Sequence, residues 1–133
     1  MRTAQLDIDT TGQQLVDLTD DIRRFCSESN DGLVNVFVPH ATAGLAIVEL
    51  NDGSEADLLA LVERLLPKDI DYNHSHGSRG HGADHLTPTI FSPSLVIPVV
   101  GGQLQLGTWQ YVVLVDRNAD NPLRNVRLSF VDA

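Results

Sequence analysis

The sequence predicts a single α+β domain whose sheet is mainly antiparallel. A length of 133 residues fits one domain and leaves no room for two of ordinary size. Apolar residues recur at helical spacing in two separate segments of the first half, whereas strand-like runs follow one another closely in the last third. This separation favours an α+β fold over alternating β-α-β units, which would produce a parallel sheet.

The first fifty residues predict strands on either side of one helix. Apolar and polar residues alternate from Thr3 to Asp9, which indicates an edge strand. A helix is expected from about Gln14 to Ser27, with a buried face formed by Leu15, Leu18, Ile22 and Cys26. The β-branched run Leu33–Val38 and the apolar run Gly44–Leu50 are separated by only a few residues, so we expect them to pair with each other.

A second helix is expected after the turn residues Asn51-Asp52-Gly53. Ser54 and Asp57 have the spacing of a capping box, and Pro67 ends the helix. The expected buried stripe of this helix comprises Leu58, Leu61, Val62 and Leu65. Glycines 77, 80 and 82 argue against a helix between Lys68 and Leu86.

The rest of the chain predicts a succession of strands. They are expected over Thr89–Phe91, Leu95–Val100, Leu104–Leu106, Thr108–Asp116 and Asn125–Val131. The turn-forming pair Gly101-Gly102 predicts a hairpin. Nearly every residue from Trp109 to Val115 is apolar, so both faces of this strand should be covered.

Composition narrows the partners that we expect. Eighteen acidic and nine basic residues give a net charge of −9, which repels nucleic acid. A phosphorylated small molecule would need a local basic residue or a bound metal ion on such a surface.

No apolar run approaches the roughly 20 residues that span a bilayer, so no membrane association is expected. The single cysteine, Cys26, cannot form an internal disulfide, and the N-terminal residues lack signal-peptide features. These features favour a cytoplasmic location.

All five histidines lie between positions 40 and 85, and four fall within one short stretch: His74, His76, His81 and His85. Imidazole is the commonest protein ligand for metals, and a glycine-rich loop can fold so that several rings converge. The spacing matches no standard zinc motif, however. A functional cluster and a solvated, histidine-rich surface loop therefore both remain open.

Two further polar residues stand out near the first strands. His40 follows a strand and Pro39, which places its ring at a sheet end beside the hydroxyl of Thr42. Glu49 lies in an otherwise apolar run, where burial would raise its pKa and suit it to acid–base catalysis. A structural role for His40 and an outward-facing Glu49 are the alternatives.

The segment Gly107-Thr108-Trp109-Gln110 has no nucleotide-binding glycine pattern, yet it places a polar Gln beside an indole. Tryptophan in such a strand most often belongs to the core. Arg79, Arg117 and Arg124 could clamp a phosphate group, or could equally form ordinary ion pairs.

Six short motifs follow one another along the chain: His40-Ala-Thr-Ala, Glu49-x-Asn51-Asp52, Tyr72-Asn-His74, His85-Leu86, Ser94-Leu-Val-Ile-Pro98 and Leu106-Gly-Thr-Trp-Gln110. Together they resemble the YjbQ-like family, small proteins classed as secondary thiamine-phosphate synthases. The resemblance extends from about Ala4 to Phe130, and the last motif is the most specific. It implies one domain over residues 1–133, a mainly antiparallel β-sandwich flanked by two helices, that assembles as a homotrimer.

The resemblance also implies a reaction: hydroxymethylpyrimidine diphosphate is coupled with thiazole phosphate, and pyrophosphate is released. It assigns catalysis to His40, Glu49 and His85, and a divalent metal ion, Mg²⁺ or Zn²⁺, to His40, His74 and His85. The substrate-binding residues that it implies are Thr42, Asn51, Asp52, Thr108, Trp109, Gln110 and Arg124.

The chain departs from the family pattern in the histidine-rich loop. Gly80 and His81 stand where acidic residues are usual, and His76 is an addition. Outside the loop, Tyr111 follows Trp109-Gln110 where glycine is common.

Two other functions remain open for such a chain. One is a trimeric module that binds a metal or phosphate without turnover, and the other is a metal-dependent hydrolase of a different substrate.

Overall fold

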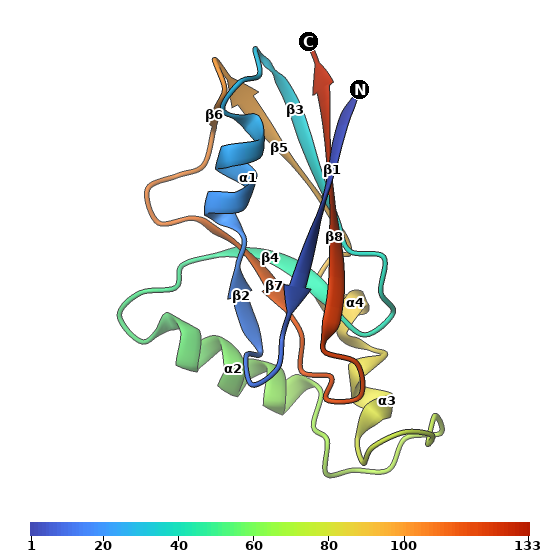
Figure 1. The fold of residues 1–133 in the computed structure, drawn as a ribbon. Helices are drawn as coiled ribbons and strands as arrows, with labels where there is room; N and C mark the ends of the chain where they lie inside the picture. Colours follow the sequence, from blue (N-terminus) through green and yellow to red (C-terminus); the bar gives the residue numbers. More distant parts are fainter.

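The computed structural model describes residues 1–133, which form two antiparallel sheets (Figure 1). The larger sheet has the order β1-β8-β3-β5-β6 and consists of β1 (Arg2–Asp9), β8 (Leu123–Asp132), β3 (Gly32–Phe37), β5 (Ser94–Val100) and β6 (Gln103–Leu104). The smaller sheet, β2-β7-β4, consists of β2 (Leu15–Asp17), β7 (Tyr111–Val115) and β4 (Gly44–Val48). The predicted α+β class with mainly antiparallel sheets is confirmed.

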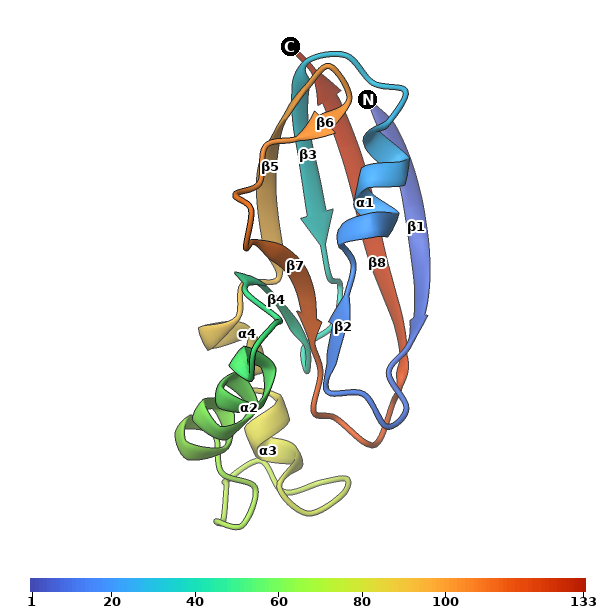
Figure 2. The same ribbon diagram turned by 90° about the vertical axis from the view of Figure 1, so that its left-hand side faces the viewer.

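The helices are α1 (Thr19–Cys26), α2 (Ser54–Leu65), α3 (His81–Asp84) and α4 (Thr87–Ile90). Helix α1 packs against the larger sheet, whereas α2, α3 and α4 gather at the opposite end of the molecule, beside the smaller sheet (Figure 2). No helix combines the length and the apolar character that a bilayer-spanning segment requires.

The main core lies between the larger sheet and a layer formed by α1 and the smaller sheet. Alternate residues of β3 and β8 face it, and the most deeply buried include Val34, Val36, Val126, Leu128 and Phe130. Each such side chain stabilises the fold by roughly 1.5–3 kcal/mol relative to an exposed one. Strand β1 lies at the edge of the larger sheet, as its alternating pattern predicts.

Strand β7 is covered on both faces, as its continuous apolar run predicts. Val112 and Leu114 belong to the main core, whereas Val113 and Val115 belong to a second cluster with Val62 of α2. The smaller sheet is therefore a middle layer between the larger sheet and α2. Only the first residue of β7, Tyr111, is partly exposed, whereas the strand is buried from Val112 to Val115.

The first helix is shorter than predicted. Leu15 to Asp17 form a strand because they pair with Val113 to Val115 of β7. The Asp17 carboxylate then accepts hydrogen bonds from the backbone N–H (2.9 Å) and hydroxyl (2.6 Å) of Thr19, and the helix begins there. The later part of the predicted buried face, from Leu18 to Cys26, is correct.

The second helix begins without the predicted capping box. Gly53 precedes it in a left-handed conformation (φ 88°), and Ser54 is the first helical residue, with no side-chain cap. Val62 is its only buried residue, whereas Leu61 and Leu65 are exposed. Helix α2 therefore lies on the periphery and does not contribute the whole expected stripe to a core.

Four other predictions about the elements are wrong. The glycines at 77, 80 and 82 do not prevent a helix between Lys68 and Leu86, because His81–Asp84 form the single turn of α3 after the left-handed Gly80. β3 and β4 belong to different sheets, because the backbone of β4 turns away to contact Phe91 and the Leu45 N–H donates to Ser92 O (2.8 Å). The segment from Thr89 belongs to the short helix α4, where Pro88 occupies the first turn. Thr108–Gln110 is a turn and not a strand, so β7 begins only at Tyr111.

Candidate functional site

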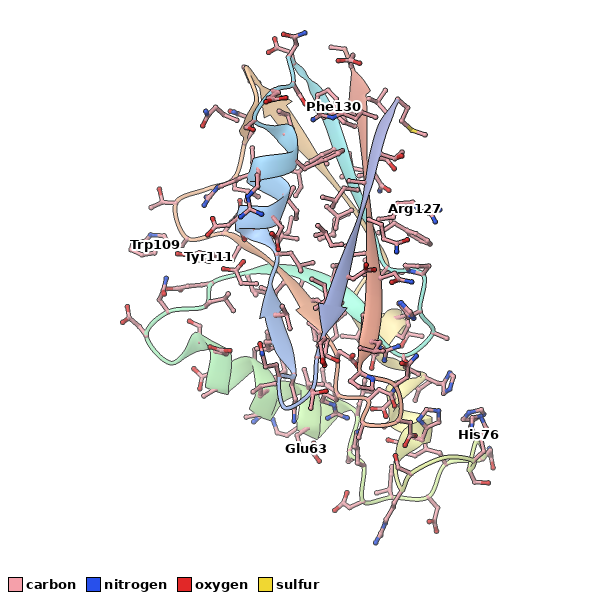
Figure 3. The ribbon with its side chains drawn as sticks, viewed as in Figure 1. Glu63, His76, Trp109, Tyr111, Arg127 and Phe130 are labelled. Carbon is pink, nitrogen blue, oxygen red and sulfur yellow. The ribbon has the colours of Figure 1, made fainter.

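The four histidines of the loop converge into one group, defined here as the histidine cluster: His74, His76, His81 and His85. One ring nitrogen from each lies within 4.8 Å of those of the others. The Nε2 atoms of His81 and His85 are 3.0 Å apart, so these nitrogens either share a proton or both face a cation. His76, labelled in Figure 3, lies on the loop beside α3 and β8. The cluster interpretation, left open by sequence spacing, matches this geometry.

The single turn of α3 and the loop before it position the four rings. His81 and His85 are four residues apart, which places them on the same side of the turn. The preceding loop crosses directly over α3, and a Cβ atom on Gly82 would lie 2.5 Å from Cβ of Tyr72. Glycine at position 82 therefore lets the segment that carries His74 pack closely against the segment that carries His81 and His85.

A carboxylate supports the cluster from behind. Oδ2 of Asp120 lies 2.9 Å from Nδ1 of the buried His81. Ser78 donates hydrogen bonds to the same oxygen from its backbone N–H (3.1 Å) and its hydroxyl (3.0 Å). The Ser78 N–H and hydroxyl, helped by the charges of His81 and Lys68, lower the pKa of Asp120. A carboxylate that faces Nδ1 in this way favours the tautomer that carries the proton on Nδ1 and leaves the Nε2 lone pair free for a ligand.

A second acid lies underneath the cluster. Asp84 is fully buried, and Lys68 Nζ lies 2.9 Å from its Oδ1. Its Oδ2 is 3.7 Å from Nδ1 of His81. The Lys68–Asp84 pair therefore ties the beginning of the loop to α3, and Lys68 also donates to the carbonyl of Arg117 (2.7 Å). Neither Lys68 nor Asp84 was singled out from the sequence.

The surroundings favour uncharged imidazoles. Desolvation lowers the pKa of His74 below its usual value, and the neighbouring rings of His76 and His81 lower it further. Desolvation also lowers the pKa of His85, as do its neighbouring rings, while Asp84 acts in the opposite direction. Neutral imidazole is the form that binds metal ions, so the surroundings of His74 and His85 favour binding of a cation.

A polar cavity of about 190 Å³ opens beside the cluster. His74 and His81 line one side of it, and Ser75, Ser78 and Arg79 contribute other lining groups. Only two lining residues, Ile70 and Tyr72, are hydrophobic. The cavity thus offers hydroxyls and one guanidinium next to the imidazoles, which are groups that bind phosphate oxygens.

His40 lies outside the histidine cluster, contrary to the expected metal set. Its Nε2 accepts the backbone N–H of Asn125 (2.9 Å), so this nitrogen is already used. Burial lowers the pKa of His40, the charge of Arg124 lowers it further, and Asp116 opposes the shift. The ring is held near the start of β8 by this bond. In place of His40, His76 and His81 join His74 and His85 in the cluster.

Arg124 and Thr42 form a buried structural network instead of the expected phosphate contact. Arg124 donates from Nε to Asp116 Oδ2 (2.7 Å), and from Nη2 to Asp116 Oδ1 (3.0 Å) and Thr42 Oγ1 (2.7 Å). Thr10 donates its hydroxyl to Asp116 as well (2.7 Å). A guanidinium that is engaged in this way and 2% exposed is not free to bind a ligand.

The remaining predicted residues lie at the far end of β4 and β7. Glu49 is exposed, so the expectation of a buried carboxylate is wrong and the outward-facing alternative is correct. Trp109 is 62% exposed and not part of the core, and it projects on the side of the molecule opposite His76 (Figure 3). The site residues that follow Glu49 or lead into β7 share this end: Asn51, Asp52, Thr108 and Gln110.

These features define a class: a small α+β protein of two layered antiparallel sheets with a carboxylate-supported histidine cluster at one end. Residues 4–133 match the family described as UPF0047 protein YjbQ-like. The chain belongs to this family.

Relatives and solved structures agree with that assignment. The chain is 60% identical to UPF0047 protein Rv2556c of Mycobacterium tuberculosis over 132 residues, which cover 99% of each chain. It is 40% identical over 103 residues to a UPF0047 protein of Archaeoglobus fulgidus, covering 77% of this chain and 80% of that one. The crystal structure of a hypothetical protein from Aeropyrum pernix K1 superposes with a TM-score of 0.89 at 31% identity and covers all of both chains.

Proposed function

We propose that this protein is a metal-dependent transferase of the secondary thiamine-phosphate synthase type, with the metal ion held by the histidine cluster. The observation that carries the proposal is the convergence of four ring nitrogens within 4.8 Å, supported from behind by Asp120. Membership of the YjbQ-like family and the polar cavity beside the rings support the same conclusion.

The donor atoms favour Zn²⁺ over Mg²⁺. Four imidazoles suit zinc and related transition metals, whereas Mg²⁺ prefers oxygen ligands and retains water. A tetrahedral zinc site with ordinary Zn–N bonds places its ligand nitrogens about 3.3 Å apart. The Nε2 atoms of His81 and His85 are 3.0 Å apart, close to that value, and one ring nitrogen from each of the four histidines lies within 4.8 Å of the others.

In the proposed reaction, the thiazole nitrogen forms a bond to the methylene carbon of the pyrimidine while the bond from that carbon to the diphosphate oxygen breaks. The diphosphate leaves with the electron pair. A bound metal ion would supply positive charge to its oxygens. Arg79 is the only basic residue apart from the histidines that lines the cavity, and its guanidinium would hold the phosphate groups in place.

We also propose that the protein is a cytoplasmic homotrimer. The outer face of the larger sheet carries a patch, named here the sheet patch: Leu33, Val96, Pro98, Val100 and Val131. Leu33 lies opposite both Pro98 and Val131 in the sheet register, so the patch is continuous across three strands. Exposed apolar patches on a sheet commonly mark protein–protein contacts, and further copies of the same uncharged patch would cover it.

Turnover measured with and without metal tests the proposal. Protein stripped with a chelator and protein reloaded with Zn²⁺ are incubated with hydroxymethylpyrimidine diphosphate and thiazole phosphate, and thiamine phosphate is quantified. We expect product only from the reloaded protein, and at least a tenfold loss in Arg79→Gln protein that still binds zinc. Equal product from stripped and reloaded protein would show that no metal takes part.

One observation favours a second function, a metal-binding module without turnover. Four protein ligands fill a tetrahedral zinc shell, whereas catalytic zinc sites keep one position open for water or substrate. Tight zinc binding by calorimetry together with no product under all conditions would establish this alternative. His74 and His76 decide between the two functions, because they are the exposed members of the cluster and a ring that leaves would open a coordination position.

A further inference from the structure

The turn before β7, named here the tryptophan turn (Gly107–Gln110), presents an exposed indole on a rigid support. The Gln110 N–H donates to Gly107 O (3.0 Å), and the Gly107 N–H donates to the Gln110 side-chain oxygen (2.8 Å). These two bonds close the turn on both sides while Trp109 remains 62% exposed. Trp109 is the only tryptophan of the protein. The turn therefore displays an aromatic side chain instead of burying it.

Apart from its imidazoles, the cavity beside the histidine cluster has only one aromatic side chain, that of Tyr72. Its two hydrophobic lining residues are Ile70 and Tyr72, and the Tyr72 hydroxyl is engaged with Pro67 O (2.6 Å). The imidazoles and Arg79 can hold a metal ion and phosphate groups. A flat heteroaromatic ring, however, is best held by stacking on another aromatic face. One chain therefore supplies a single phenol ring for stacking, whereas a flat heteroaromatic substrate has two faces that an aromatic side chain could cover.

The tryptophan turn and the histidine cluster cannot meet within one chain. Strand β4 separates them: its first residue, Gly44, contacts Phe91 at the end of α4, shortly after His85. Its last residue, Val48, pairs with Tyr111, next to the tryptophan turn. Five extended residues alone span roughly 13 Å from the first Cα to the last. Figure 3 places Trp109 and His76 on opposite sides of the molecule.

We propose that the active site is composite, with the tryptophan turn of a second copy of this chain closing over the histidine cluster of the first. A contact between two different ends of the same chain is heterologous, and it closes into a ring when the rotation allows. Charge supports the pairing: Glu49 and Asp52 are exposed beside the turn, whereas Arg79 lines the cavity beside the cluster, where a metal ion would add further positive charge. The inference rests on the proposed function, because the indole of the second copy would supply a stacking face for the proposed heteroaromatic substrate.

Fluorescence of the single tryptophan tests the contact without any turnover. Cu²⁺ serves as the probe, because it binds imidazole clusters and quenches indole emission at short range. Two variants are needed: Trp109→Phe, which keeps the cluster but has no indole, and His74→Gln/His85→Gln, which keeps the indole but loses two ligands. They are unfolded together in equal amounts and refolded into mixed oligomers, whose size and circular dichroism are compared with the parent protein.

We expect Cu²⁺ to quench Trp109 in the parent oligomer and to leave the histidine variant alone unquenched. In randomly mixed rings, about half of the remaining indoles face an intact cluster on a neighbour, so about half of the emission should be lost. An unquenched mixture, or an unquenched parent oligomer that binds Cu²⁺ by calorimetry, would overturn the composite site. Absence of Cu²⁺ binding to the parent protein would overturn the metal centre as well, which separates the two failures.

Activity gives a second, independent measurement where turnover is detected. Each variant alone should lose at least tenfold in kcat/KM, because each lacks one half of every site. Mixed rings should recover about a quarter of the parent activity, since both halves are intact in that fraction of randomly paired interfaces. Full retention of activity by Trp109→Phe and Trp109→Ala, or no recovery on mixing when both variants are inactive alone, would show that each chain carries its own complete site.

Discussion

At the scale of single residues, His81 differs from the other members of the histidine cluster because it is buried and its Nδ1 faces a carboxylate. Nothing in the spacing of the loop histidines indicates Asp120, which lies on a different loop after β7. The spacing of His81 and His85 does indicate a shared helical face, and that signal was available in the sequence. The cluster was therefore predictable in part, whereas its supporting carboxylate was not.

Asp120→Asn should weaken zinc binding by about 10- to 100-fold, because the amide no longer fixes the His81 proton on Nδ1. Isothermal titration calorimetry with Zn²⁺ measures the change. Asp71→Asn is the matched control, since Asp71 lines the same cavity but has no contact with a histidine nitrogen. Equal zinc affinities for the Asp120 variant and the parent protein would contradict a supporting role.

His40 gives a pH dependence whose sign follows from its environment. Its pKa is lowered in the folded protein, so the unfolded chain takes up the proton first as the pH falls. The stability that neutral His40 confers is thus complete above the usual histidine pKa of about 6.5 and is lost below it. The urea midpoint of metal-free protein should fall between about pH 7.5 and about pH 5.5, and less steeply in His40→Gln protein. An equal slope in both proteins would contradict the assignment.

Arg124 shows how burial changes the role of a charged residue. From the sequence it was equally compatible with phosphate binding and with an ion pair, and the buried Asp116 decides in favour of the ion pair. Removing one partner of a buried pair costs about 3–5 kcal/mol, so Arg124→Ala should destabilise the protein by that amount in urea unfolding. Arg23→Ala, which removes an exposed pair with Asp20, should cost only about 0–1 kcal/mol. Similar losses for the two variants would argue against this network.

At the scale of elements, strong periodicity identified the right segments but not their partners. The alternation in β1, β3 and β8 and the apolar run of β7 were visible because burial on one or both faces leaves a repeating pattern. The separation of β3 from β4 was not visible, because the contact with Phe91 that directs β4 into the smaller sheet depends on a distant segment. Leu15–Asp17 fits a helical spacing equally well, and pairing with β7 decides its conformation.

Close packing of two glycine-containing segments sets the geometry of the cluster, so a methyl group at Gly82 should disturb it. Its Cβ would lie 2.5 Å from Tyr72 Cβ and 2.7 Å from His74 O. We expect Gly82→Ala to cost about 1–3 kcal/mol of stability and to weaken zinc binding, because His74 moves away from α3. Gly12→Ala is the control: its Cβ would meet nothing within 4 Å, and zinc affinity should not change. Unchanged zinc affinity in Gly82→Ala protein would show that this packing does not set the site.

At the scale of the whole molecule, the two groups of site residues lie at opposite ends of a layered fold. A linear sequence orders Glu49, His74, His85 and Trp109 along one chain, but it does not show that β4 and β7 hold them apart. The motif resemblance therefore identified the family correctly, whereas in the proposed composite site the assembly of its residues depends on how copies of the chain associate. That dependence makes the oligomeric state the decisive property of the molecule.

Leu33→Glu places a charge at the centre of the sheet patch, where Leu33 is 47% exposed and lies opposite Pro98 and Val131. A carboxylate buried without a partner in an interface is costly, so the proposed homotrimer should dissociate into folded monomers. Sedimentation velocity measures the mass, and circular dichroism confirms that the larger sheet persists. Thr3→Glu introduces the same charge on the edge strand β1, outside the patch, and should leave the trimer intact. A Leu33→Glu protein of unchanged mass would show that copies of the chain associate elsewhere. Dissociation without loss of zinc binding would show that the cluster forms within one chain.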